Sequence, residues 1–268
     1  MRQSLVLLVV LGVLLLMPGC STGTRPSPTS TPVWTATPVP TATPVLPVVF
    51  IGDSVTMGAF ASTPENMFIV RVQRGLWARG IDARNDVEWT MEPYSDLLAA
   101  QRVADSHRKA IIVELGVHWA LFAANQFREV YGAMLDCLAG SGARVVVGTI
   151  PWLNWQPDSP AYFEIAFFSQ IIREEAAKRG IAVADLWAAT VQRADAISRP
   201  EQPCFTEPAC RGDDYHPGDT GHALIAQAYL DALDVALKTT PQPHEHRCDF
   251  DKCLNALANG LPVPVDGP

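Results

Sequence analysis

The sequence has no cluster of basic residues and carries a formal net charge of -8 at pH 7. Its lysines and arginines are scattered along the chain, so it lacks the positively charged surface that binds phosphate backbones. We therefore expect no nucleic-acid partner.

Two glycine patterns are also missing. The pattern Gly-x-Ser-x-Gly does not occur, which argues against the α/β-hydrolase family. A glycine cluster that could cradle a phosphate group is absent around Gly52-Asp53-Ser54, which makes a nucleotide-binding function a poor fit.

No apolar segment at the N-terminus is long enough to cross a membrane. The run 5–16 follows Met1-Arg2 and holds about twelve apolar residues, too few for about 30 Å of hydrocarbon. Residues 1–20 fit a secretory signal peptide better. The small residue before Cys20 resembles a bacterial lipobox, so we expect Cys20 to be lipidated and to become the new N-terminus. An ordinary signal peptide, or an uncleaved anchor with Cys20 as a spectator, is the alternative.

The next segment, residues 21–44, is rich in threonine and proline and cannot bury a core. We interpret it as a linker that holds an exported, extracytoplasmic domain away from a membrane surface. Residues 45–240 have the length of one domain, which we expect to be monomeric, and residues 241–268 form a tail that contains cysteines.

Apolar stretches alternate with amphipathic stretches throughout this domain. The apolar stretches predict buried strands and the amphipathic ones predict helices. The expected strands are 45–51, 86–89, 110–115, 143–150 and 181–186, and the expected helices are 66–79, 95–106, 123–139, 161–179 and 219–237. This alternation predicts an α/β fold with a doubly wound parallel sheet. The segment 187–212 is expected to be an irregular loop that helps to wall a cleft.

Two motifs suggest nucleophilic catalysis. Gly52-Asp53-Ser54-Val55 follows the first predicted strand, and Asp213-Asp214-Tyr215-His216-Pro217 lies near the end of the domain. A serine hydroxyl needs a histidine to take its proton and a carboxylate to orient that histidine. Ser54 would lie at the carboxyl end of a parallel strand, where open α/β sheets bind ligands.

The stretches FIGDS, IIVELGVHW and DDYHPGDTGHALIA resemble blocks of the SGNH (GDSL-type) esterase and lipase superfamily. The resemblance covers residues 45–237. It implies a flavodoxin-like three-layer α/β/α sandwich with a five-stranded parallel sheet. It also implies that Ser54 is the nucleophile, His216 the general base and Asp213 the residue that orients the base, with no cofactor. Asp214 is the other carboxylate candidate.

The chain departs from the family pattern in its oxyanion donors. The third block of the family reads Gly-x-Asn-Asp, but this chain has Gly116, Val117, His118 and Trp119. His118, with Gly116, is the candidate oxyanion site, because an imidazole N–H can donate a hydrogen bond. The matching second block, residues 90–96, contains no glycine, so its backbone donor stays unassigned. Two functions remain open: an exported serine esterase acting on an acyl or acetyl ester of a lipid or carbohydrate, and a catalytically degenerate ligand- or glycan-binding lipoprotein.

The cysteines agree with export. Cys204 and Cys210 bracket one short loop and Cys248 and Cys253 bracket another, so two local disulfides are the simplest pairing. Cys137 is expected to be a free, buried thiol. His244, His246, Cys248 and Cys253 could in principle bind zinc, but their spacing is wider than usual and exported thiols tend to oxidise, so we expect no metal site.

Several polar residues near the motifs have a structural interpretation. His222 competes with His216 as a base, but its place at the start of a helix favours a packing or capping role. Asp53 is expected to fix the loop as a hydrogen-bond acceptor. Asp185 is expected to be structural. Trp152, Asn154 and Trp155 follow the fourth predicted strand and are candidates for the pocket wall.

Overall fold

The centre of the fold is a parallel sheet whose strand order is β2-β1-β3-β4-β5. The computed structural model describes residues 45–90, 93–106, 108–115, 124–152, 160–191, 193–197 and 216–239. The strands are β1 (Val45–Gly52), β2 (Asp82–Trp89), β3 (Ala110–Glu114), β4 (Arg144–Gly148) and β5 (Ala182–Ala184). Every neighbouring pair is parallel, and the order matches the flavodoxin-like sheet that was expected.

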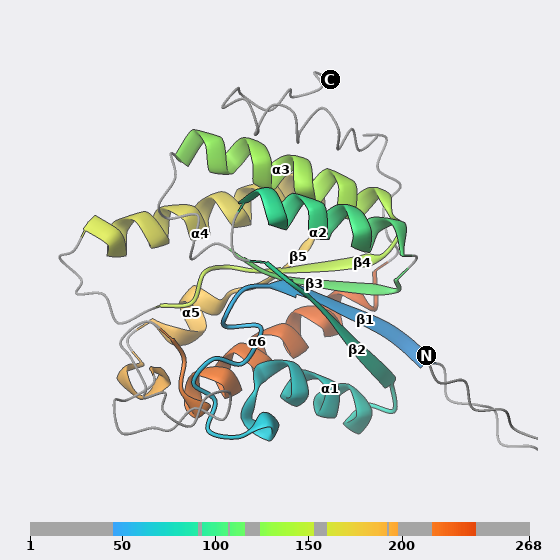
Figure 1. The fold of residues 1–268 in the computed structure, drawn as a ribbon, viewed down its shortest axis with the longest axis vertical. Coiled ribbons are helices and arrows are strands. Elements are labelled where there is room, and N and C mark those ends of the chain that lie inside the picture. The colour runs from blue at the N-terminus through green and yellow to red at the C-terminus, as the bar shows by residue number, and fades with distance from the viewer. Residues whose placement is uncertain are drawn as a thin grey trace, which may run out of the picture. The chain divides into compact units, whose positions relative to one another are not determined.

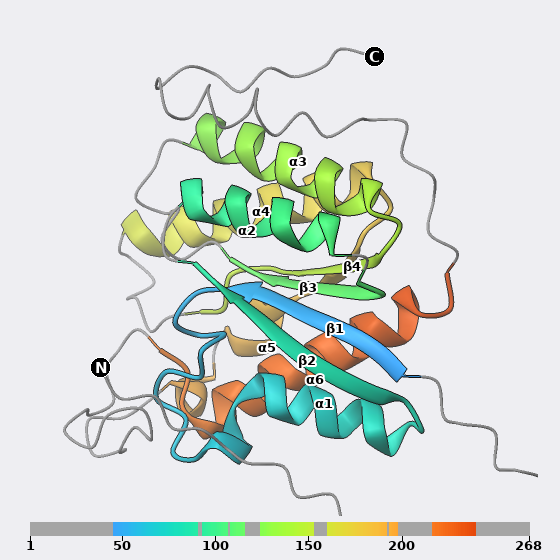
Figure 2. The same cartoon turned by 45° about the vertical axis from the view of Figure 1, so that its right-hand side comes forward.

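Helices cover both faces of this sheet and make three layers (Figure 1). On one face lie α2 (Pro93–Asp105), α3 (Ala124–Gly140) and α4 (Pro160–Lys178). On the other lie α1 (Phe68–Ala78) and α6 (Asp219–Ala236), and the turned view in Figure 2 keeps the same two groups apart. The predicted helices are therefore confirmed, with ends that shift by one or two residues.

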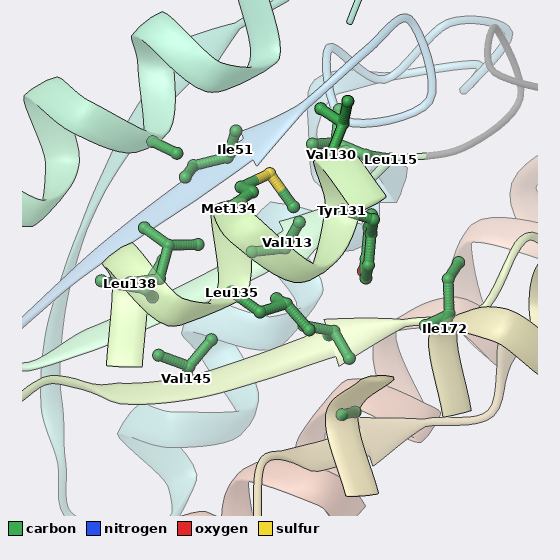
Figure 3. Packing of buried hydrophobic residues seen from close by; sticks show 14 of the residues in the cluster. Ile51, Val113, Leu115, Val130, Tyr131, Met134, Leu135, Leu138, Val145 and Ile172 are labelled. Atoms are coloured by element: carbon green, nitrogen blue, oxygen red, sulfur yellow. The ribbon is translucent and has the colours of Figure 1, made fainter. Parts of the chain in front are cut away.

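Side chains along each strand point alternately to the two faces of the sheet, and this divides the core into two clusters. Val49 and Ile51 of β1 pack with α2, α3 and α4, whereas Val48 and Phe50 pack with α1 and α6. Figure 3 shows the first cluster, in which Tyr131 and Met134 of α3 pack over β1 and β3. Because β1 is buried on both faces, its sequence is a continuous apolar run, as parallel strands require.

The chain leaves β1 for β2 on one side and later returns to β3 on the other side of β1. The point between β1 and β3 is thus where the strand order reverses, and ligands of open α/β sheets bind outside the carboxyl ends of strands at such a point. The residues after Gly52 and Glu114 lie at this place, since Gly52 and Glu114 are paired in register.

The prediction of an irregular loop from residue 187 was wrong in its first part. The strand β5 ends at Ala184, and a short helix, α5 (Leu186–Thr190), follows, with the 3-10 turn η3 (Ala194–Ala196) after it. The helix begins there because the Asp185 side chain caps it, accepting a hydrogen bond from the Ala188 N–H. Asp185 also binds Thr149 and Arg173, so its structural role is confirmed.

The second strand begins earlier than predicted, at Asp82.

The prediction of a free thiol at Cys137 was also wrong. Cys137 is buried in α3 and takes part in a disulfide bond. Burial alone does not separate a thiol from a half-cystine, because both behave as small apolar side chains.

Cys20, Cys204, Cys210, Cys248 and Cys253 lie outside the described residues, as do the predicted signal peptide, linker and tail. Within the described ranges, no helix has both the length and the apolar character needed to cross a membrane.

Candidate active site

The turn that carries Ser54 begins at a glycine that has no room for a side chain. A Cβ atom on Gly52 would come 1.9 Å from Thr56 Oγ1 and 2.7 Å from the Glu114 backbone oxygen. After Gly52 the backbone turns at once: Met57 N–H donates to the Asp53 oxygen over 3.0 Å, and Ala59 N–H donates to the Ser54 oxygen over 2.9 Å. This close packing places Ser54 directly past the carboxyl end of β1.

Beneath the turn lies a buried pair of carboxyl groups. Asp53 Oδ1 accepts a hydrogen bond from Val55 N–H over 3.0 Å, so the predicted loop-fixing role is confirmed. Glu114, at the end of β3, accepts from Thr56 Oγ1 over 3.0 Å. Both carboxylic side chains belong to residues no more than 2% exposed. The turn is therefore tied to β3 as well as to β1.

Burial raises the pKa of Glu114 well above its ordinary value of 4.5, and the neighbouring charge of Asp53 raises it further. A hydrogen bond between the Glu114 and Asp53 side chains acts in the same direction, whereas the Thr56 hydroxyl opposes it. Two neighbouring buried carboxylates cannot both ionise at low cost, which is why the charge of Asp53 raises the pKa of Glu114. Asp96 of α2, which is hydrogen-bonded to Thr90, adds a further negative charge nearby.

Ser54 and His216 meet although they are 162 residues apart. Ser54 Oγ and His216 Nε2 are 2.8 Å apart. This distance lies inside the range in which a base can remove the hydroxyl proton. With Nε2 unprotonated, Ser54 donates to it and Nδ1 carries the ring proton. The close approach expected from the two motifs is therefore present.

The segment that carries His216 is held by its neighbours in space. Pro217 forms an isolated antiparallel bridge with Ile197, and Gly218 N–H donates to the Ala196 oxygen over 3.0 Å. The first turn of α6 packs so closely on this segment that a Cβ atom on Gly221 would come 2.0 Å from the Ala196 oxygen. The chain on the C-terminal side of His216 is thereby fixed to the turn after α5.

The aromatic ring of Phe60 packs on the His216 imidazole, with ring centroids 4.8 Å apart and planes 32° apart. Phe60 comes from the loop that follows the turn carrying Ser54. No motif contains Phe60, and the stretch IIVELGVHW contains Glu114 without giving it a role. The one available signal for Glu114 was its position at the end of a strand that is otherwise apolar.

His222 does not reach Ser54. It is fully buried, and its Nε2 lies 3.1 Å from the Ala59 backbone oxygen. Burial lowers the pKa of His222 from 6.5 to about 4. The packing role expected for His222 is confirmed.

The other residues of the expected site lie outside the described residues. They are Asp213, Asp214, Gly116, His118, Asn154 and Trp155, together with the segment 91–92. Trp152 is described and half-buried, and its backbone N–H donates to Thr190 Oγ1 over 2.7 Å. No group of three or more potential metal ligands occurs among the described residues.

A family model described as GDSL-like lipase/acylhydrolase matches residues 50–224, which is more than half of the chain. The chain belongs to this family. The match contains both Ser54 and His216. Membership in the GDSL-like lipase/acylhydrolase family supports an esterase-type hydrolase.

Solved structures share the fold at low sequence identity. The structure of TesA has a TM-score of 0.57 and 17% identity, and the alignment covers 71% of this chain and 99% of TesA. The structure of the acetyl xylan esterase AlAXEase has a TM-score of 0.54 and 20% identity, and the alignment covers 70% of this chain and 100% of the esterase. The structure of the acetylxylan esterase Axe2 from Geobacillus stearothermophilus has a TM-score of 0.51 and 18% identity, and the alignment covers 70% of this chain and 94% of Axe2. The comparison with curated proteins found no match.

Proposed function

We propose that the protein is an exported serine esterase that hydrolyses an acyl or acetyl ester of a carbohydrate or lipid through an acyl-Ser54 intermediate. The observation that carries this proposal is the 2.8 Å approach of Ser54 Oγ to His216 Nε2. Membership in the GDSL-like family supports it, and similarity to two acetyl xylan esterases favours an acetyl group on a carbohydrate.

In the proposed reaction, His216 Nε2 takes the hydroxyl proton while Ser54 Oγ forms a bond to the ester carbonyl carbon. The tetrahedral intermediate collapses, the carbon–oxygen bond to the alcohol breaks, and the imidazolium returns the proton to the leaving alcohol. Water then attacks the acyl-Ser54 ester in the same way and releases the acid. Asp213 is proposed to hold the Nδ1 proton of His216, and His118 with Gly116 to donate to the oxyanion.

The test is pre-steady-state hydrolysis of p-nitrophenyl acetate. We expect a burst of p-nitrophenol equal to the enzyme present, and a loss of at least about 10³-fold in kcat for Ser54→Ala. A series from acetyl to octanoyl esters, together with acetylated xylan, then separates short-acyl from long-acyl preference. Equal hydrolysis by the wild type and Ser54→Ala would overturn the proposal.

The departures at residues 90–96 and 118 favour a second candidate, a ligand- or glycan-binding lipoprotein that has lost its oxyanion donors. Losing one such donor costs roughly 2.7 to 4 kcal/mol. Absence of any burst, together with saturable binding of xylo-oligosaccharides in calorimetry, would favour this second function.

We also propose that the protein is tethered by a lipid on Cys20 and that residues 21–44 act as its spacer. The sequence at 17–20 and the Thr/Pro-rich composition support this. In a bacterial host, radiolabelled fatty acid should enter the wild type and not Cys20→Ser. Equal labelling of both proteins would contradict the tether.

A further inference from the structure

The loop after the nucleophile turn contains an unfavourable backbone conformation. Among the described residues, Phe60 is the one residue other than glycine with a positive φ, which is 62°. A side chain with a Cβ atom adopts this region at a cost, so the surrounding structure must impose it. Such residues occur often at functional sites.

This conformation directs the Phe60 ring onto the histidine that meets Ser54. The Phe60 and His216 ring centroids are 4.8 Å apart, while His216 Nε2 lies 2.8 Å from Ser54 Oγ. An aromatic ring packed on an imidazole limits its rotation. The orientation of Nε2 toward Ser54 therefore depends on where the Phe60 ring lies.

The first turn of α6 binds the loop on both sides of Phe60. On one side, His222 Nε2 lies 3.1 Å from the Ala59 oxygen. On the other side, the Asp219 carboxylate accepts from Ser62 N–H over 2.8 Å and from Ser62 Oγ over 2.5 Å. Three hydrogen bonds from a single helical turn thus span the strained residue.

The proton on His222 is fixed by its partner. A backbone carbonyl oxygen only accepts, so Nε2 must carry the hydrogen in this bond. His222 is fully buried, and its Nδ1 has no hydrogen-bond partner among the described residues. The neutral ring with the proton on Nε2 is therefore the form that the packing selects. The ring also stacks on Phe68 of α1, with centroids 6.2 Å apart.

The same short segment carries His216, Asp219 and His222. Movement of this segment would therefore shift the imidazole and the loop that covers it together.

We propose that Phe60 is a positioning residue for His216, and that Asp219 and His222 hold Phe60 in place from the first turn of α6. The proposal rests on the proposed serine esterase function, because it assigns Phe60 a role in presenting the base to Ser54. The alternative is that Phe60 contacts the substrate acyl group.

The first experiment separates the ring from the backbone. Glycine adopts a positive φ freely, so Phe60→Gly removes the ring and relieves the strain, while Phe60→Tyr keeps the ring. We expect Phe60→Gly to lower kcat for p-nitrophenyl acetate about tenfold, with KM within about twofold of the wild type. Phe60→Tyr should restore most of kcat. A raised KM with unchanged kcat would assign Phe60 to substrate contact and overturn the proposal.

The second experiment tests the hydrogen bonds from α6. His222→Phe keeps the aromatic stack on Phe68 but cannot donate to Ala59, whereas His222→Gln keeps a donor. We expect His222→Phe to slow labelling of Ser54 by a fluorophosphonate several-fold and His222→Gln to recover the rate. Melting temperatures measured by circular dichroism identify any variant whose slow labelling comes from misfolding.

Asp219→Ala should slow labelling in the same way. Asp234→Ala is its matched control, because Asp234 lies in the same helix and pairs with Arg79 over 3.1 Å, far along the chain from the loop contacts. We expect Asp234→Ala to label at the wild-type rate.

The two proposals fail in different ways. If the wild type is never labelled at Ser54, the esterase function is wrong. If the wild type is labelled and Phe60→Gly, His222→Phe and Asp219→Ala are labelled equally fast, the positioning role is wrong and the esterase function stands.

Discussion

Ser54 and His216 are held in different ways. Ser54 lies in a turn that is tied directly to the buried ends of β1 and β3, through Gly52, Asp53 and Glu114. His216 lies before α6 and is held by the segment near Ala196 and by the Phe60 ring. Ser54 thus depends on the sheet, and His216 depends on contacts between loops that are distant in sequence.

This difference predicts where the arrangement is most sensitive. Changes to the residues that hold the Ser54 turn, such as Gly52, should act first on folding, because they disturb the sheet. Changes to the residues that contact His216 itself, such as Phe60, should act first on catalysis, because the sheet is not tied to them.

The largest expected effect is on the histidine side. If Asp213 orients His216 as proposed, Asp213→Asn should lower kcat about 10³- to 10⁴-fold, because the imidazole would lose the carboxylate that fixes its tautomer. Asp214→Asn is the matched neighbour and should stay within about twofold. Steady-state hydrolysis of p-nitrophenyl acetate measures both. If Asp214→Asn carries the larger loss, the assignment of the acid moves to Asp214.

The next effect is on the nucleophile side. Gly52→Ala should destabilise the fold by about 4 kcal/mol or more, because its Cβ would overlap Thr56 and the β3 backbone. Gly80→Ala is the control: a Cβ there meets no atom within 4 Å, and the cost comes only from its φ of +74°. It should lose about 1 kcal/mol. Urea unfolding of both variants tests the ranking, and equal losses would contradict it.

His222 should make the stability of the protein fall at acidic pH. Its pKa falls from 6.5 in the unfolded chain to about 4 in the fold, mainly through burial, while the hydrogen bond to the Ala59 oxygen and the charge of Asp219 act in the opposite direction. The unfolded state therefore binds more protons, so stability is full above pH 6.5 and is lost as the pH falls toward 4. The loss should reach up to about 3 kcal/mol.

Chemical unfolding at several pH values between 7 and 4 measures this loss. In His222→Gln the free energy of unfolding should depend less steeply on pH over this range than in the wild type. An unchanged slope would show that His222 does not cause it.

Glu114 gives the nucleophile side the opposite dependence. Its pKa is raised above 4.5 by burial and by the charge of Asp53, so the folded state binds the extra proton. Stability from this pair is full below pH 4.5 and is lost as the pH rises through the raised pKa. Glu114→Gln carries no titratable proton, so its free energy of unfolding should fall less than that of the wild type as the pH rises above 4.5.

The comparison for Glu114 is Glu114→Ala, which removes the Thr56 contact and should lower stability at every pH. If Glu114→Gln and Glu114→Ala behave alike, the shared proton is not what matters.

The smallest expected effect compares two buried tyrosines on opposite faces of the sheet. The Tyr131 hydroxyl in α3 has no hydrogen-bond partner among the described residues, whereas Tyr229 in α6 donates to the Val113 oxygen over 2.9 Å. Tyr131→Phe should be neutral or stabilise by about 1 kcal/mol, and Tyr229→Phe should cost about 1 kcal/mol. Thermal unfolding distinguishes the two, and equal losses would contradict the assignment of bonds.

The sequence predicts the sheet well because a parallel strand buried on both faces must be apolar throughout, as in Val45–Gly52. It also predicts the meeting of Ser54 and His216, since each lies within a recognisable motif. The helix α5 was missed because its start depends on one side chain, Asp185, competing with the end of a short strand.

The contacts that orient the site are harder to predict. Phe60 is an ordinary apolar residue in sequence, and its positive φ occurs between Ala59 and Ser62, which are hydrogen-bonded by residues about 160 positions away. The bond between Thr56 and Glu114 likewise joins residues 58 positions apart. The disulfide at Cys137 has no local signal, because the helix around it has the pattern expected of any buried helix.

The most direct test is mass spectrometry of the protein after reaction with a fluorophosphonate between pH 6 and 9. We expect one adduct, on Ser54, that is absent in Ser54→Ala and forms much more slowly in His216→Ala. Intact wild-type protein that carries no adduct anywhere in this pH range, or an adduct on a different residue, would contradict the account.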